Sequence, residues 1–215
     1  MTDWDVYLVT QASLSAGRDT SEVVRAAIDG GVDVVQLREK DVPARDRYHL
    51  GRELRELTRK AGVPLLVNDR ADIAQAIDAD GVHLGDEDLP IEVARELLGE
   101  DAIVGRSVSF VEDALEAEQA GADYLGVGAI YATGSKDDID DDEYAIGLDR
   151  LESICEAVDI PVVGIGGVDA TNASDVAEAG ADGVAVISAI TGAADPAAAT
   201  RELGEAVRSG RTRSA

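Results

Sequence analysis

Two cations and an amide stand together in one short segment, Gln36-Leu37-Arg38-Glu39-Lys40. The apolar run 32–35 before it has the character of a buried strand, and a helical pattern follows the polar turn 41–43. In parallel α/β proteins, ligands bind where such strands end. The segment therefore predicts an anion-binding loop, although a salt-bridged loop at a helix start is the alternative for this motif taken alone.

Two carboxylates, Asp69 and Asp88, end neighbouring predicted strands and face Arg38 and Lys40. This arrangement suggests a Mg²⁺ site, because Mg²⁺ takes one or two carboxylates together with phosphate oxygens. The alternative is that each aspartate caps the helix that follows it, a role for which aspartate is a preferred residue. Cations and a metal in one cluster indicate a diphosphate ligand.

A second anion site is predicted from glycines. Segment 164–167 contains three glycines and follows the seventh predicted strand, and Ser188 follows the eighth. Glycines let backbone N–H groups approach phosphate oxygens, and the loops after strands seven and eight are a frequent phosphate site in barrels. Tight turns that need a positive φ are the alternative. The position of the glycines favours a phosphomonoester, so two phosphorylated ligands are expected.

A repeat governs the elements that must position these residues. Four segments, 30–35, 79–84, 121–127 and 180–187, share a small-residue turn followed by an apolar strand pattern. Further strands are predicted at 6–10, 64–67, 102–105 and 161–165, and helices at 21–29, 44–61, 71–77, 91–98, 111–120, 148–158, 172–179 and 196–207. Eight alternating units predict a single α/β domain, a (β/α)8 TIM barrel over 1–207, rather than an open doubly wound sheet. The basic tail 208–215 is expected to be disordered.

Composition narrows the function further. The 215 residues carry a net charge of −25 and a pI near 4.2, which argues against nucleic acid or an anionic membrane as partner. Lysine occurs only at Lys40, Lys60 and Lys136. Because the carboxylates are spread along the chain, the acidic surface resembles a halophilic adaptation more than an acidic partner-binding face. Because lysine is otherwise avoided, Lys40 and Lys136, which lie in loops predicted to share one face, are interpreted as functional residues.

The remaining bulk features predict a cytoplasmic protein. No apolar run approaches the ~18 residues of a membrane span, and residues 1–3 begin no signal peptide. The only cysteine, Cys155, lies on the apolar face of a predicted helix and is interpreted as a core thiol rather than a nucleophile. A homo-oligomer is possible, and the sequence does not decide the oligomeric state.

Five ordered motifs together resemble the thiamine-phosphate synthase family, from the first predicted strand to Ser188. The motifs are Gln36 to Lys40, Asn68-Asp69, Gly81 to Asp88, Gly128 to Lys136, and Val163 to Gly167. The resemblance implies a transferase that condenses 4-amino-2-methyl-5-(diphosphooxymethyl)pyrimidine with a thiazole phosphate. The products would be thiamine phosphate and pyrophosphate.

The resemblance also implies roles for individual residues. Those implied for the pyrimidine diphosphate are Gln36, Leu37, Arg38, Glu39, Lys40, Asn68, Ser107 and Lys136. Those implied for the thiazole phosphate are Thr133, Gly134, Ser135, Gly167, Ile187 and Ser188, and those for Mg²⁺ are Asp69 and Asp88. The catalytic set would be Arg38, Lys40, Ser107 and Lys136. Dissociative loss of pyrophosphate fits this set, because it needs neutralised charge on the leaving group and no strong general base.

The chain departs from the family pattern at three positions. Ala132 stands where Pro is common, Ser135 where Thr is common, and Asp86 where Gln is common. Asp86 adds a negative charge near the predicted metal. The acidic stretch 137–144 is interpreted as a solvated segment or a lid over the diphosphate, and His83 as a hydrogen-bonded barrel-interior residue or a ligand contact.

Three rival functions remain. A thiazole tautomerase of the same fold would bind thiazole phosphate without needing a diphosphate or metal site. A sugar-phosphate epimerase would account for the glycine loops but not for two anion sites. A non-catalytic phosphate-ligand sensor would not need the cluster of cations and carboxylates.

Overall fold

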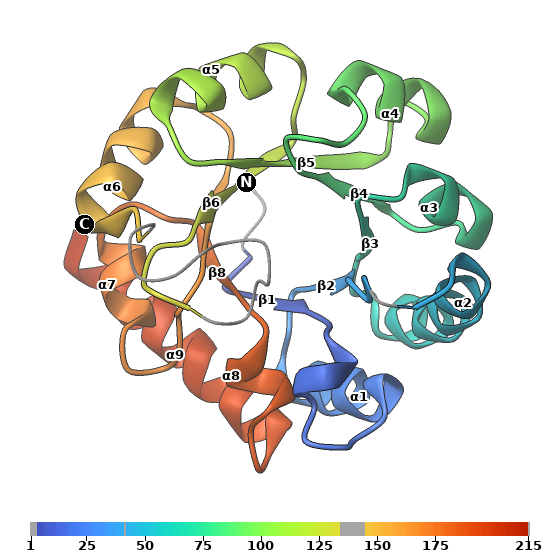
Figure 1. The fold of residues 1–215 in the computed structure, drawn as a ribbon. Helices are drawn as coiled ribbons and strands as arrows, with labels where there is room; N and C mark the ends of the chain where they lie inside the picture. Colours follow the sequence, from blue (N-terminus) through green and yellow to red (C-terminus); the bar gives the residue numbers. More distant parts are fainter. Residues whose placement is uncertain (1–3, 41, 134–144, 215) are drawn as a thin grey trace.

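A computed structural model describes residues 4–40, 42–133 and 145–214. Eight parallel strands pair in sequence order and close into a barrel, with the helices forming an outer ring (Figure 1). The strands are β1 (Val6–Val9), β2 (Val34–Leu37), β3 (Leu65–Asn68), β4 (Gly81–Leu84), β5 (Ile103–Val108), β6 (Tyr124–Gly128), β7 (Val162–Ile165) and β8 (Gly183–Val186). The predicted (β/α)8 barrel is confirmed.

The helices alternate with these strands as the periodicity predicts. They are α1 (Thr20–Gly30), α2 (Ala44–Ala61), α3 (Ala71–Ile77), α4 (Ile91–Leu98), α5 (Val111–Gln119), α6 (Gly147–Ala157), α7 (Ala173–Glu178), α8 (Ser188–Thr191) and α9 (Pro196–Ser214). The 3-10 turn η1 (Ala12–Leu14) and α8 were not predicted, because three or four residues cannot display a helical period. In the described part of the chain, no helix is long and apolar enough to cross a membrane.

Side chains of each strand alternate between two separate cores. The outer core lies between the strands and the helices, and consists of branched aliphatic residues and alanines. The inner core fills the barrel and contains Trp4, Tyr7, Val9, Val34, Leu66, Tyr124, Val163, Ala185 and Ile187. Because successive residues of a strand face opposite sides, the register of each strand decides which side chains reach the barrel interior.

The aspartates of the sequence repeat join the strands in pairs. Each backbone N–H donates to the carbonyl of a residue on the preceding odd-numbered strand, and each carboxylate accepts the N–H of that same residue. The pairs are Asp33 with Val6, Asp80 with Leu65, Asp123 with Val104, and Asp182 with Val162, with N–H to carboxylate distances of 2.9, 2.7, 2.7 and 2.8 Å. The repeat thus encodes a two-way clamp at the amino ends of the strands.

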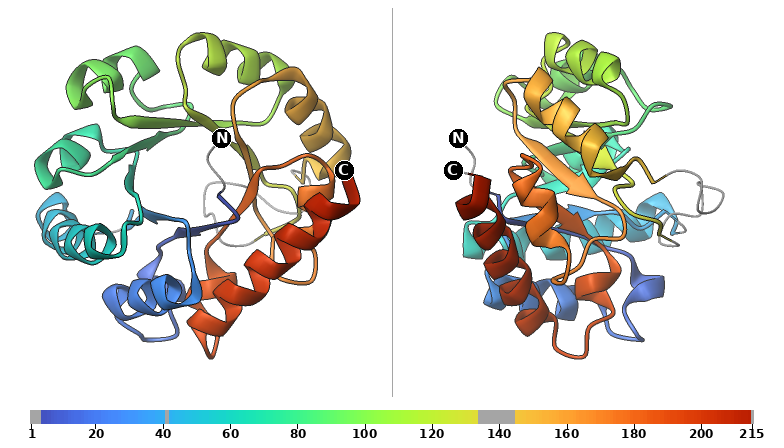
Figure 2. Two further views of the ribbon diagram at one scale, coloured as in Figure 1. Left: turned by 180° about the vertical axis from the view of Figure 1, so that it is seen from behind. Right: turned by 90° about the vertical axis from the view of Figure 1, so that its left-hand side faces the viewer.

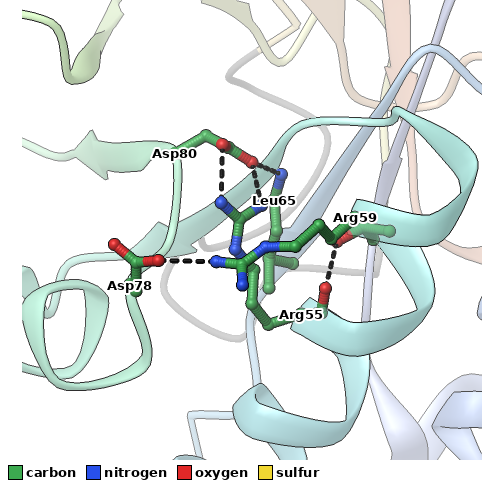
Figure 3. Close-up of polar contacts among 6 residues, drawn as sticks. Arg55, Arg59, Leu65, Asp78 and Asp80 are labelled. Carbon is green, nitrogen blue, oxygen red and sulfur yellow. Dashed lines mark hydrogen bonds and ion pairs between the residues drawn. The ribbon is translucent and has the colours of Figure 1, made fainter.

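One clamp is reinforced by an arginine of α2, beside which a second arginine of that helix forms another ion pair (Figure 3). Arg55 donates two hydrogen bonds to Asp80, at 2.6 and 2.9 Å, while Arg59 pairs with Asp78 at 2.5 Å. The Arg55 and Asp80 side chains are 15% and 31% exposed, whereas those of Arg59 and Asp78 are 59% and 85% exposed. The two neighbouring ion pairs therefore differ in burial and in the number of hydrogen bonds.

The carboxyl-terminal tail is helical, contrary to the prediction of disorder. Helix α9 continues to Ser214, so the expectation of disorder from residue 208 is wrong for the described residues. Arg208 and Arg211 donate to Asp5 at 2.7 and 2.6 Å, and α9 packs against α1 and α7 (Figure 2). Basic side chains near a helix carboxyl end are favourable, so the composition that suggested disorder stabilises this end.

We predict that Asp80→Asn lowers the free energy of unfolding by about 2 kcal/mol, because Arg55 loses its charged partner in a partly buried place. Urea unfolding at fixed salt measures the loss. Asp78→Asn is the matched control, and its exposed ion pair predicts a change below about 1 kcal/mol. Equal losses in the two variants would contradict the importance of the clamp.

Candidate active site

Residues from three strands converge at the carboxyl ends of the barrel. A cavity of about 220 Å³ is lined by Gln36, Arg38, Lys40, Asn68, Asp69 and Ser107, together with interior residues that include Tyr7, His83 and Tyr124. Residues as far apart in the sequence as Gln36 and Ser107 therefore meet at one mouth. This is the arrangement expected for a barrel in which the loops after the strands build the site.

The alternation of β2 separates the residues of the first motif. Gln36 and Arg38 are buried and line the cavity, and the Arg38 guanidinium donates to the Gln11 side chain at 3.2 Å. Leu37 is fully buried in the outer core, where it approaches Gly51 of α2. Its side chain faces away from the mouth, and the predicted contact of Leu37 with the pyrimidine diphosphate stays a prediction.

The Glu39 side chain has partners within the protein. Its carboxylate accepts from the Ala12 N–H at 2.9 Å and from the Thr20 hydroxyl at 3.4 Å. The buried Glu39 carboxylate therefore fastens η1 and the start of α1 to the end of β2. The predicted contact of Glu39 with the pyrimidine diphosphate stays a prediction, since these bonds occupy only its side chain.

Arg47 of α2 holds the loop that carries Lys40. Its guanidinium donates to the carbonyls of Glu39 and Lys40, at 2.6 and 3.1 Å. Burial lowers the pKa of Arg47, and the nearby positive charge of Arg70 adds to this effect. The sequence prediction missed Arg47, although a helical period places it on the buried face of α2 with Gly51.

Asp69 and Asp88 lie side by side, and neither caps a helix. Helix α3 follows Arg70 and α4 follows Pro90, and neither start has a side-chain cap. Burial, and after it the adjacent Asp88 carboxylate, raise the pKa of Asp69 from 3.8 to about 6. Lys40 Nζ lies 4.0 Å from the Asp69 carboxylate. Paired carboxylates that repel each other form a donor set suited to a cation.

The same pair also limits what kind of metal the described residues could hold. Among the described residues there is no group of three or more His, Cys, Asp or Glu side chains that would hold an ion. Two carboxylates fit Mg²⁺, which keeps water and phosphate oxygens as its other ligands. The residues therefore fit a metal that is completed by a phosphorylated ligand.

Asp86 is an exposed residue that is paired with a cation. Its side chain is 86% exposed and forms an ion pair with Arg106 of β5 at 3.1 Å. Arg106 also donates to the carbonyl of Gly85, so it braces the loop in which Asp88 accepts the Gly85 N–H at 2.6 Å. The departure from the family pattern at Asp86 is thus balanced by a local cation.

The glycine-rich segment forms a second cavity of about 240 Å³, whose lining includes Thr133, Gly167, Ile187 and Ser188. Gly166 and Gly167 have φ values of +101° and +65°, and a Cβ on Gly167 would lie 2.8 Å from the Ala132 carbonyl oxygen. The glycines therefore fit both interpretations, a tight turn that needs a positive φ and a cavity in which the backbone approaches a ligand.

The two cavities adjoin. Ile165, Ala185 and Ile187 line both of them, so ligands in the two cavities would meet across this shared wall. Of the other predicted residues, Gly134, Ser135 and Lys136 lie outside the described residues, as does the acidic stretch 137–144.

Cys155 and His83 have the surroundings that the sequence suggested. Burial, and after it the nearby Asp182 charge, raise the pKa of the Cys155 thiol to about 12, so the thiol is not a nucleophile near neutral pH. His83 is hydrogen-bonded in the barrel interior and also lines the first cavity.

Fold and site together define a (β/α)8-barrel enzyme with two adjoining cavities at the carboxyl ends of its strands. A family model described as thiamine monophosphate synthase matches residues 6–190. The chain belongs to this family.

Individual relatives agree with the family. A protein of Haloarcula marismortui named thiamine-phosphate synthase is 70% identical over 98% of this chain and 100% of its own length. A relative of the same name from Natronomonas pharaonis is 69% identical over 95% of each chain. The solved thiamine phosphate pyrophosphorylase of Pyrococcus furiosus is 44% identical over 98% of each chain, with a TM-score of 0.87. A 3-hexulose-6-phosphate synthase from Salmonella typhimurium, 19% identical over 96% of this chain and all of its own with a TM-score of 0.70, shares the fold alone.

We predict that Asp69→Asn stabilises the metal-free protein at about pH 8. The raised pKa means that the folded state holds this proton more tightly than the unfolded state, so stability falls as the pH rises from about 4 to about 6. Asparagine carries no such penalty. Urea unfolding at about pH 8 and about pH 5, with a chelator present, measures the difference, which should shrink at the lower pH.

The exposed Glu87→Gln is the control for removing one negative charge from this acidic chain. It should not reproduce the gain, because Glu87 lies outside the cavity that contains Asp69. A lower stability of Asp69→Asn at about pH 8 would refute the carboxylate repulsion.

Proposed function

We propose that the chain is a thiamine-phosphate synthase, which joins 4-amino-2-methyl-5-(diphosphooxymethyl)pyrimidine to a thiazole phosphate and releases pyrophosphate. The observation that carries this proposal is the adjoining pair of cavities, one with cations and paired carboxylates and the other with glycines. The names of the relatives at 70% and 69% identity support the same activity.

The first cavity would stabilise the leaving pyrophosphate. Arg38 and Lys40 line it and would neutralise the charge that develops as the bond to the pyrimidine methylene breaks. Asp69 and Asp88 would hold Mg²⁺, which supplies further positive charge to the leaving group when bound. In our proposal Lys136 adds a third cation, as the family pattern implies.

The rest of the mouth would orient the two reactants. Gln36, Asn68 and Ser107 line the first cavity and would hold the pyrimidine ring. Thr133, Gly167, Ile187 and Ser188 would hold the thiazole phosphate in the second cavity, with Gly134 and Ser135 added by the family pattern. The shared wall would place the thiazole nitrogen in line with the methylene carbon, so orientation replaces a general base.

The rival functions account for less of the site. A thiazole tautomerase would use the glycine-lined cavity and leave the cations and paired carboxylates unexplained. A sensor would not need the cluster of cations and carboxylates in which burial, and after it the nearby Asp88 charge, raise the pKa of Asp69. We propose that the enzyme acts in the cytoplasm, where its acidic surface keeps it hydrated at high salt, as the net charge of −25 suggests.

We expect the purified chain to form thiamine phosphate and pyrophosphate in equal amounts when both substrates and Mg²⁺ are present. Chromatography of the product and a pyrophosphate assay measure the two independently. Omission of Mg²⁺ should slow the reaction strongly, because a leaving diphosphate needs its charge neutralised. Isomerisation of the thiazole without pyrophosphate release would favour the tautomerase.

We predict that Asp88→Asn lowers kcat about 10- to 100-fold and raises the Mg²⁺ concentration needed for half-maximal rate. Asp86→Asn is the matched control, two residues away and paired with Arg106, and should leave kcat within about 3-fold of the parent. Steady-state rates over a Mg²⁺ titration measure both variants. If the two variants lose activity equally, Asp88 has no special role at the metal.

A further inference from the structure

A continuous chain of hydrogen bonds crosses the barrel interior and joins two residues of the first cavity. Gln36 Nε2 donates to the Tyr7 hydroxyl at 2.7 Å, and that hydroxyl lies 2.8 Å from the Tyr124 hydroxyl. The Tyr124 hydroxyl lies 2.7 Å from His83 Nδ1, and His83 Nε2 lies 2.9 Å from the Ser107 hydroxyl. Five side chains from five strands, β2, β1, β6, β4 and β5, are thus connected in line.

The Gln36 amide at one end fixes the direction of hydrogen-bond donation along the whole series. Because the Tyr7 oxygen accepts from Gln36, the Tyr7 proton is available for Tyr124, and the Tyr124 proton for His83 Nδ1. A neutral imidazole that accepts at Nδ1 carries its proton on Nε2 and donates it to Ser107. The Ser107 oxygen is then an acceptor within the chain, and its own proton is left for a ligand.

Packing holds the middle of the chain in one place. Tyr7 and Tyr124 are 2% and 1% exposed, and the Trp4 and Tyr124 rings meet edge to face at 5.2 Å. A Cβ on Gly105 would lie 2.2 Å from the Tyr124 ring, and one on Gly126 would lie 2.9 Å from the His83 ring. These two glycines therefore make the space that the tyrosine and the histidine occupy.

We propose that Tyr7, Tyr124 and His83 are positioning residues that fix the hydrogen-bonding polarity of Gln36 and Ser107, the two ends of this hydrogen-bond chain, both of which line the first cavity. Ser107 presents a donor, and Gln36 keeps its amide oxygen as an acceptor. The cavity is thereby selective for a heteroaromatic ring that offers an acceptor nitrogen and a donor amine. An aminopyrimidine has both groups. Naming it as the ligand rests on the proposed function, whereas the direction of the hydrogen bonds does not.

The polarity is tested by nitrogen NMR of the ligand-free protein. The chain has two histidines, and the exposed His49 is assigned with His49→Gln. We expect the ¹⁵N shifts of His83 to be those of a neutral ring protonated at Nε2. A neutral ring protonated at Nδ1, or an imidazolium, would overturn the proposed direction.

The functional consequence is tested with Tyr124→Phe, which keeps the ring and removes the central hydroxyl. We expect kcat/KM for the pyrimidine diphosphate to fall about tenfold or more, with the KM for thiazole phosphate within about twofold of the parent. Tyr48→Phe is the control, since Tyr48 lies outside the first cavity and its hydroxyl accepts from Arg52 at 3.4 Å. Equal effects on both substrates, or no effect, would overturn the positioning role.

Tyr7→Phe keeps the proposal falsifiable if Tyr124→Phe folds poorly. It breaks the neighbouring link, so we expect the same selective loss, and the double variant should lose no more than the larger single variant. Additive losses would mean that the two hydroxyls act separately, and would overturn the proposed positioning role of the hydrogen-bond chain. If no thiamine phosphate forms while His83 is protonated at Nε2, the proposed function fails and the polarity stands.

Discussion

The reciprocal bond between an aspartate and the start of the preceding strand is the constraint on which the barrel depends. It occurs four times, before each even-numbered strand, and uses both the backbone and the carboxylate of each aspartate. Because a slip of one residue would turn every side chain of a strand to the opposite face, these clamps secure the register. They do so at the end of the barrel remote from the cavities, so the functional loops need not supply this stability.

Register in turn decides the chemistry at the mouth. It places Gln36 and Arg38 inside and Leu37 outside, and it brings Asp69 close to Lys40 in a chain with a net charge of −25. The paired carboxylates cost stability, as the raised pKa of Asp69 indicates. Such a cost is common at sites that bind cations, because the repulsion is relieved only when the ligand is present.

A polar chain through an apolar barrel is acceptable only if each of its groups has a partner. Here the amide of Gln36 begins the series of hydrogen bonds and the hydroxyl of Ser107 ends it, and all five residues line the first cavity. Interior glycines at 105 and 126 are the sequence feature that permits it. The packing of the barrel and the orientation of a ligand are therefore parts of one arrangement.

The sequence by itself determined the eight strand–helix units and the ends of the strands at which polar residues collect, because periodicity and turn chemistry are local properties. It also placed Asp69, Asp88, Gly167 and Ser188 at the mouth before any coordinates. Only the tertiary structure decided that Leu37 faces outward, that Glu39 fastens η1, and that α9 continues through the expected tail. The partnership of Tyr7 with Tyr124 likewise joins residues 117 positions apart. Such partners depend on the closure of the barrel, which no local pattern contains.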